Sequence, residues 1–194
     1  EKAMLKKNES GRSMVEMLGV LTIVGVLSVG GLNVINQMQN ERTSTQMLAD
    51  ISDLARRAKR MACQYDSGYS SYTFYLYKSN AYPEGWNYDS TKKKFSGLKG
   101  SLYSIKGTAN ADSGVAESFE IIIENLSDEQ CSKLATFDWG GKNTSGIESV
   151  MVNNATDAVA VVGTDSYPMT FSKATTKCDK GNANKIELKY LGCN

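Results

Sequence analysis

The most apolar stretch of the chain lies near its N-terminus. Residues 14–32 carry one charged side chain, Glu16, and they follow a polar leader that contains Lys2, Lys6 and Lys7. At a rise of about 1.5 Å per residue, a helix over this stretch is about 28 Å long, which is enough to cross the hydrocarbon core of a bilayer. Lysines on its N-terminal side predict a cytoplasmic N-terminus. We therefore expect one membrane-spanning helix that carries an exported C-terminal part.

The helical period continues beyond this segment. Apolar residues recur mostly at steps of three and four from Ile35 to Ala62, and no proline or glycine lies between Leu32 and Tyr65. This pattern predicts one helix from about Ser13 to Gln64, whose second half buries an apolar stripe against another surface. That half also carries a basic patch, which either faces solvent or meets an acidic face of a neighbouring molecule. The patch consists of Arg56, Arg57, Lys59 and Arg60.

The remaining residues, 65–194, predict an α+β head. Alternating or β-branched runs separated by turns indicate several strands, and the helix at 35–62 is the element available to cover their sheet. Ser127 and Gln130 have capping-box spacing, so a short helix should follow Ser127 and extend to about Thr136. The strand candidates are Ser71–Lys78, Ser118–Asn125, Ser149–Val152, Ala158–Val162, Met169–Phe171 and Lys185–Leu191.

Composition excludes several classes of function. The chain has 22 Lys and Arg against 21 Asp and Glu, a net charge of +1, which argues against a nucleic-acid-binding protein. It has no histidine, which removes the commonest general base and metal ligand. No phosphate loop, acid pair or metal cluster is recognisable, so we predict neither an enzyme nor a cofactor. Tyrosine-rich residues 65–87 either form an adhesive surface or, as we favour, pack beneath the connecting loop.

The cysteines point to an oxidising compartment. Four of them follow the apolar segment at wide spacing, and none forms a C-x-x-C pair. Two disulfides are therefore expected rather than a zinc or thioredoxin-type site. The spacing alone leaves all three pairings of Cys63, Cys131, Cys178 and Cys193 open.

The basic leader, Gly11, the apolar helix and the carboxylate of Glu16 together resemble the class III signal of type IV prepilins and pseudopilins. The resemblance implies cleavage after Gly11 and N-methylation of Arg12, which occupies a position where the family usually has Phe or Met. Glu16 is then the fifth mature residue. In a filament, its buried carboxylate would pair with the amino group of a neighbouring subunit's Arg12. The alternative is that Glu16 has no such role and only reaches the lipid headgroups near the end of the helix.

The head resembles a narrower class. A strand followed by a short helix with a cysteine and Lys133-Leu134-Ala135 is similar to the type IVb pilins, the toxin-coregulated and bundle-forming class. In that class the helix cysteine bonds to one that precedes the last strand and closes the D-region. The resemblance implies a Cys131–Cys178 disulfide, which leaves Cys63 and Cys193 as a second pair.

These observations predict a pilin-like protein with four regions. They are a leader at 1–11, a membrane-spanning and filament-core segment at 12–33, an amphipathic half-helix at 34–64 and an α+β head at 65–194. The resemblance implies a pilus subunit that is held in the bacterial inner membrane and then polymerised into a surface filament for adhesion or aggregation. Its partners would be copies of itself, a prepilin peptidase, a platform membrane protein, an assembly ATPase, and host or sister-cell surfaces. A minor pilin or a type II secretion pseudopilin is the alternative.

Overall fold

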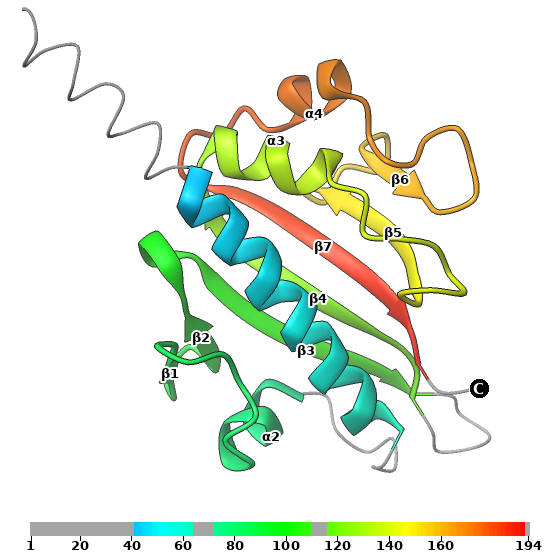
Figure 1. Cartoon of the computed structure of the whole chain (residues 1–194). Helices are drawn as coiled ribbons and strands as arrows, with labels where there is room; N and C mark the ends of the chain where they lie inside the picture. The colour runs from blue at the N-terminus through cyan, green and yellow to red at the C-terminus, as the bar shows by residue number, and fades with distance from the viewer. Residues whose placement is uncertain (1–40, 64–71, 110–115, 193–194) are drawn as a thin grey trace, which may run out of the picture. The chain divides into compact units, whose positions relative to one another are not determined.

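The computed structural model describes residues 41–63, 72–109 and 116–192, and residues 44–194 form one compact unit (Figure 1). The predicted leader and membrane segment lie outside the described residues, as do Gly11, Arg12, Glu16 and Cys193. Within the described ranges, no helix is both long enough and apolar enough to cross a membrane.

A helix over residues 41–62 crosses one face of a β-sheet (Figure 1). Its buried residues recur at steps of three and four, as the sequence predicts for the amphipathic half of the long helix. Burying one Leu or Ile side chain contributes roughly 1.5–3 kcal/mol, so this stripe accounts for the helix's place on the sheet. The buried residues are Met47, Ile51, Leu54, Ala55, Ala58, Met61 and Ala62.

The described residues form a seven-stranded antiparallel sheet with the order β1-β2-β3-β4-β7-β5-β6. The last strand in the sequence, β7, therefore lies between β4 and β5. The strands are β1 (Asn87–Asp89), β2 (Lys94–Ser96), β3 (Leu102–Ala109), β4 (Ala116–Leu126), β5 (Ile147–Val152), β6 (Val159–Val161) and β7 (Asn184–Leu191).

Strands β4 and β7 form the centre of the sheet. Ile121 of β4 pairs with Leu188 of β7, and the rings of Phe119 and Tyr190 stack with centroids 5.1 Å apart. Buried and half-buried residues alternate along the whole of β7, because one of its faces is covered. The strands predicted at 118–125 and 185–191 are therefore confirmed, as are those at 149–152 and, in shortened form, 158–162.

The helix predicted after Ser127 is confirmed as α3 (Asp128–Thr136), with both bonds of the capping box in place. The Ser127 hydroxyl accepts from the Gln130 amide at 3.2 Å, and the Gln130 side chain accepts from the Ser127 amide at 3.0 Å. These bonds satisfy donors that the first turn of a helix leaves unpaired. The sequence signal was sufficient here because the cap is entirely local.

The strand predicted at Ser71–Lys78 is wrong, because this segment contains α2, a helix at Tyr72–Lys78. Its buried residues, Tyr72, Thr73 and Leu76, share one helical face. The Thr73 hydroxyl accepts from the Ile105 amide at 2.8 Å and donates to the Ile105 carbonyl at 3.2 Å. The Tyr72 ring lies against Gly107, where an added Cβ would be 2.1 Å from the ring. Contacts with β3 thus fix the conformation of α2.

The strand predicted at Met169–Phe171 is also wrong. Thr170 caps α4, a helix at Phe171–Lys177, and the side chain of Thr170 accepts from the Lys173 amide. Met169 is buried in the core, whereas Phe171 is 72% exposed. An apolar residue on each side of a threonine resembles an alternating strand, but here the threonine is a helix cap.

The first part of the sheet was not anticipated from the sequence. Strands β1 and β2 have three residues each, and a 3-10 turn, η1 (Leu98–Gly100), separates β2 from β3. In β3, buried Tyr103 and Ile105 alternate with less buried neighbours, which is the period-2 signal of a half-buried strand. Residues 90–93 form the turn between β1 and β2, and Lys94 is the first residue of β2.

Candidate functional sites

Three features of the head are candidates for its function: a disulfide-closed region, a groove with basic rims, and a layer of aromatic rings. Within the described part of the chain, no group of three or more Cys, Asp or Glu side chains is placed to hold a metal ion.

The disulfide joins α3 to the end of α4. Cys131 and Cys178 are bonded, with their Cα atoms 5.7 Å apart, and both are buried. This is the pairing that the sequence resemblance implied. The bond closes a loop with a sequence separation of 47 residues, a length for which the chain-entropy treatment gives about 4 kcal/mol of stabilisation. Residues 131–178 therefore form a covalently closed region at one side of the sheet.

The second predicted pair is described only in part. Cys63, which directly follows the helix at 41–62, is also disulfide-bonded, and no cysteine within the described ranges is free. Cys193 lies outside the described residues. The Cys63–Cys193 bond therefore stays a prediction.

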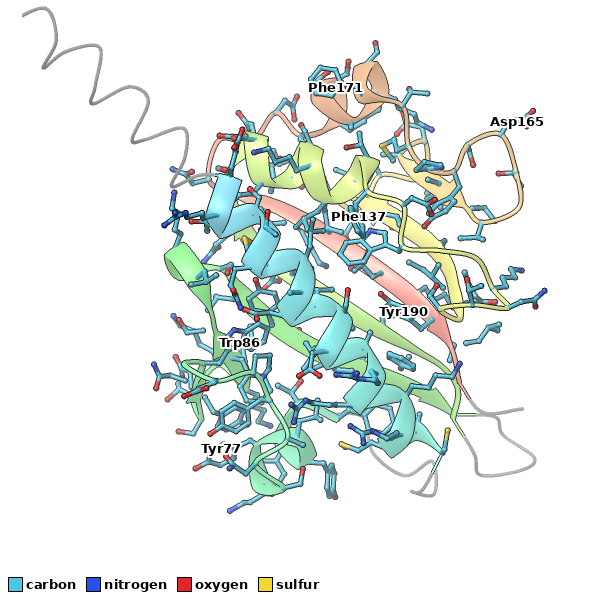
Figure 2. All side chains as sticks on the ribbon, viewed as in Figure 1. Tyr77, Trp86, Phe137, Asp165, Phe171 and Tyr190 are labelled. Atoms are coloured by element: carbon cyan, nitrogen blue, oxygen red, sulfur yellow. A yellow bond between two sulfur atoms is a disulfide. The ribbon has the colours of Figure 1, made fainter. Side chains whose placement is uncertain are left out.

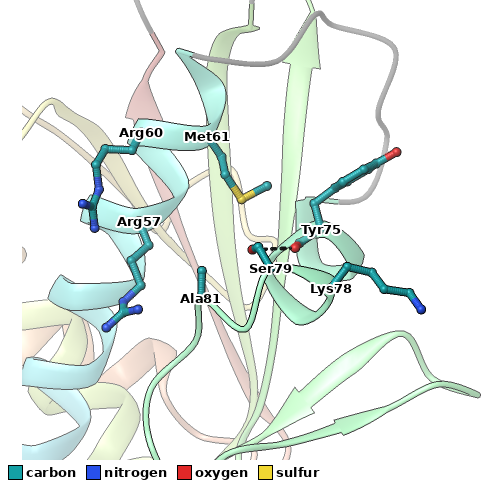
Figure 3. Close-up of a pocket in the computed structure, with 7 residues that line it drawn as sticks. All are labelled: Arg57, Arg60, Met61, Tyr75, Lys78, Ser79 and Ala81. Carbon is teal, nitrogen blue, oxygen red and sulfur yellow. Dashed lines mark hydrogen bonds between the residues drawn. The ribbon is translucent and has the colours of Figure 1, made fainter.

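The groove lies between the end of the helix at 41–62 and α2 (Figure 3), and has a volume of about 540 Å³. Arg57 and Arg60 stand at the helix side, Lys78 stands at the α2 side, and Met61 lies between them (Figure 3). No acidic residue lines this groove among the residues that the structure describes. The remaining lining residues are Tyr75, Ser79 and Ala81.

The four residues of the basic patch that the sequence predicted have different surroundings in the structure. Arg56 and Arg57 both pair with Asp53, and Arg57 Nε donates to a carboxylate oxygen at 2.6 Å. Burial raises the pKa of Asp53, but hydrogen bonds and charges from the two arginines outweigh this effect and hold that pKa below its ordinary value. Lys59 instead extends over Gly146, where an added Cβ would lie 2.9 Å from its Nζ atom. Only Arg57 and Arg60 of the patch line the groove.

The aromatic layer fills the space between α2, β1–β3 and the covering helix. Trp86 stacks on Tyr103 with centroids 4.0 Å apart, and its indole N–H donates to Asp50 at 3.3 Å. Tyr77 stacks on Tyr88 at 4.3 Å, while Tyr82 packs against Phe95. In the view of Figure 2, Trp86 lies beside the covering helix, toward β1 and β2, and Tyr77 lies next to α2. Trp86, Phe95 and Tyr103 are buried, so packing is the role of the inner rings of this layer, whereas Tyr77 is 39% exposed.

Burial affects the ionisation of two tyrosines in this core. It raises the pKa of Tyr103 from the ordinary 10.0 to about 12, although a hydrogen bond with Ser101 partly opposes the effect. Burial also raises the pKa of Tyr190 on β7. Both hydroxyls therefore stay protonated at neutral pH and belong to the packed interior.

Comparisons with known proteins found a matching family and similar solved structures. The family model described as the PilS N-terminal domain matches residues 38–190, well over half of the chain. A crystal structure of the type IVb pilin from Salmonella typhi is similar, with a TM-score of 0.54 and 17% identity over 75% of this chain and 97% of that one. TcpA, a type IV pilin from the El Tor biotype of Vibrio cholerae, matches with a TM-score of 0.45 and 13% identity over 78% and 98% of the two chains.

A search of curated protein sequences found no similar protein. The family match covers nearly all of the described residues, and the similar Salmonella typhi structure covers 75% of this chain. The chain therefore belongs to the PilS family, and its head has the α+β fold of the type IVb pilins.

Proposed function

We propose that this chain is a structural subunit of a type IVb pilus, made as a prepilin and polymerised through its N-terminal helix. The observation that carries the proposal is the match of residues 38–190 to the PilS family, joined to a head closed by the Cys131–Cys178 disulfide. The N-terminal sequence supplies the other half of the argument, because Gly11 and Glu16 have the spacing of a prepilin signal.

In this proposal, a prepilin peptidase cleaves after Gly11 and methylates Arg12. Residues 12–33 first hold the subunit in the inner membrane with the head on the periplasmic side, and later form the filament core. Residues 34–64 connect that core to the head at 65–194. The free-energy cost of removing the apolar helix from the lipid is offset because the helix is buried again among its copies in the filament. A platform membrane protein and an assembly ATPase would drive extraction.

Glu16 would fix the register of the subunits. A carboxylate buried in a filament core needs a cation, and the amino group of Arg12 in a neighbouring copy supplies one. An uncompensated buried charge costs about 3–5 kcal/mol, so subunits packed out of register would be disfavoured. The heads would then form the outer surface, which is available for adhesion or aggregation.

The test compares wild type with Glu16→Ala. We expect mature wild-type protein to begin at Arg12 and to be abundant in sheared surface filaments. The variant should be exported and anchored normally but should not assemble. Wild-type filament yield from Glu16→Ala would reject the register role. A protein that stays periplasmic, and whose loss blocks secretion, would instead identify a pseudopilin.

A further inference from the structure

A pair of asparagines lies at the junction of the elements that the Cys131–Cys178 disulfide connects. Asn184, the first residue of β7, is fully buried, and its side chain makes hydrogen bonds in several directions. Its Nδ2 atom lies 2.6 Å from Asp128 Oδ1, 3.1 Å from the Gly181 carbonyl and 3.3 Å from the Leu126 carbonyl. Its Oδ1 atom accepts from Asn153 Nδ2 at 3.0 Å and from the Lys180 amide at 3.2 Å.

Asn153 extends this cluster to α4. Its Nδ2 atom donates to the Lys177 carbonyl at 2.7 Å as well as to Asn184, and its Oδ1 atom accepts from the Lys185 amide at 2.8 Å. Both N–H groups of the Asn153 amide are thus used. Its backbone has a φ of +52°, a conformation that asparagine tolerates better than most residues.

These hydrogen bonds end beside the two half-cystines. Asp128 is one helical turn before Cys131 on α3, and Lys177 directly precedes Cys178. None of the bonds involves a sulfur atom, so each can exist when both cysteines are thiols. We propose that Asn184 and Asn153 are positioning residues, which hold Cys131 and Cys178 side by side before the disulfide forms and after it is reduced.

The reaction concerned is ordinary thiol–disulfide exchange. A thiolate of one cysteine attacks oxidised glutathione and releases one glutathione thiol. The second cysteine then attacks the mixed disulfide, forms the Cys131–Cys178 bond and releases the second glutathione. Overall, two protein thiols are oxidised and one glutathione disulfide is reduced to two thiols. Positioning accelerates and favours the second attack, because it raises the effective concentration of one protein thiol at the other.

The experiment measures that effective concentration in the full-length chain in detergent. The protein is equilibrated in buffers with different ratios of reduced to oxidised glutathione, thiols are trapped by alkylation, and the Cys131 and Cys178 peptides are quantified by mass spectrometry. Asn153→Gly removes the amide but permits the positive φ, and Asn184→Ala removes the centre of the cluster. We expect each variant to lower the effective concentration by about tenfold or more, since each loses several hydrogen bonds.

A control separates positioning from general stability. Ile105→Val lowers the stability of the same sheet on β3, which carries neither cysteine, and it should leave the effective concentration unchanged. If Asn184→Ala does not fold, the effective concentration measured for Asn153→Gly alone tests the proposal. A value within twofold of wild type for Asn153→Gly would overturn the proposal and leave the asparagines with a purely structural role. An equal fall in Ile105→Val would overturn it as well. Neither result bears on whether the chain forms a pilus.

Discussion

The two sides of the head are held together by different means. On one side, α3 and α4 are joined by the Cys131–Cys178 disulfide and by hydrogen bonds that converge on Asn184. On the other side, α2 and β1–β3 have no such covalent link among the described residues. There, stacked rings and the hydroxyl of Thr73 connect the elements.

The two sides therefore differ in how many of their residues are constrained by the contacts that hold them together. A disulfide and a buried amide specify a few atoms, so the surface between the two cysteines can vary without opening the loop. Ring stacking depends on the shapes of many neighbours, because protein interiors are close-packed. We therefore expect the aromatic side to tolerate core substitutions poorly and the disulfide side to tolerate surface changes well.

The largest effect should come from Trp86→Ala on the aromatic side. The change removes the stacking on Tyr103 and the hydrogen bond to Asp50. Truncating a buried Trp costs about 3–5 kcal/mol of the free energy of unfolding. Urea unfolding of the detergent-solubilised chain, followed by circular dichroism, measures this loss. A loss below about 1 kcal/mol would show that the rings are not what holds this side together.

Removing the disulfide should have a comparable effect on the other side. Cys131→Ala with Cys178→Ala is expected to lower the free energy of unfolding by about 4 kcal/mol, because the unfolded loop regains its freedom. The folded sheet should persist, since the asparagine cluster does not depend on sulfur. Urea midpoints and amide hydrogen exchange at β7 measure the two outcomes. Loss of exchange protection along β7 would mean that the disulfide alone closes the region.

High pH should lower the free energy of unfolding through the buried Tyr103 on the aromatic side. The folded pKa of Tyr103, about 12, lies above the ordinary value of 10.0 in the unfolded chain. The stability linked to its protonated hydroxyl is therefore complete below about pH 10 and is lost as the pH rises towards 12. This loss amounts to roughly 2–3 kcal/mol. Unfolding titrations of wild type and Tyr103→Phe should diverge in this window, and parallel pH profiles would argue against a buried phenol.

The smallest of these effects should come from Thr73→Val. Valine keeps the shape of threonine but leaves the Ile105 amide and carbonyl without the hydroxyl that they share. Such an unsatisfied buried group costs about 1–3 kcal/mol. Thr175→Val on α4 is the matched control, because its hydroxyl is exposed and bonds only within its own helix. Equal losses in the two variants would remove the proposed link between α2 and β3.

The sequence predicted best where the determining contacts are local or periodic. The capping box of Ser127 and Gln130, the alternation along β7 and the helical stripe from Ile51 to Ala62 needed no knowledge of distant residues. The Cys131–Cys178 pairing followed from a resemblance and was confirmed, whereas spacing alone left three pairings open. The roles of Gly11, Arg12 and Glu16 stay predictions, because these residues lie outside the described ranges.

The strand predicted at α2 was wrong because distant residues decide the local structure there. In α2, aromatic and polar residues are mixed over fewer than two turns, so neither a helical nor an alternating period stands out. Its helical form depends on Ile105 and on the missing side chain at Gly107, more than thirty residues away. At Thr170, two flanking apolar residues suggested a strand although one of them, Phe171, faces solvent. The contacts of α2 are not visible in a short window of sequence, whereas the bond from the Lys173 amide to Thr170 is local and was missed.

The central position of β7 sets an order for the completion of the head. Strands β1–β4 and β5–β6 have no direct strand pairing with each other among the described residues, and β7 joins them by pairing with β4 and β5. A chain that lacks Asn184–Leu191 therefore has two unfinished parts of the sheet with open edges, which are prone to mispairing. Because the last strand closes both edges, a truncated chain cannot yield a finished head.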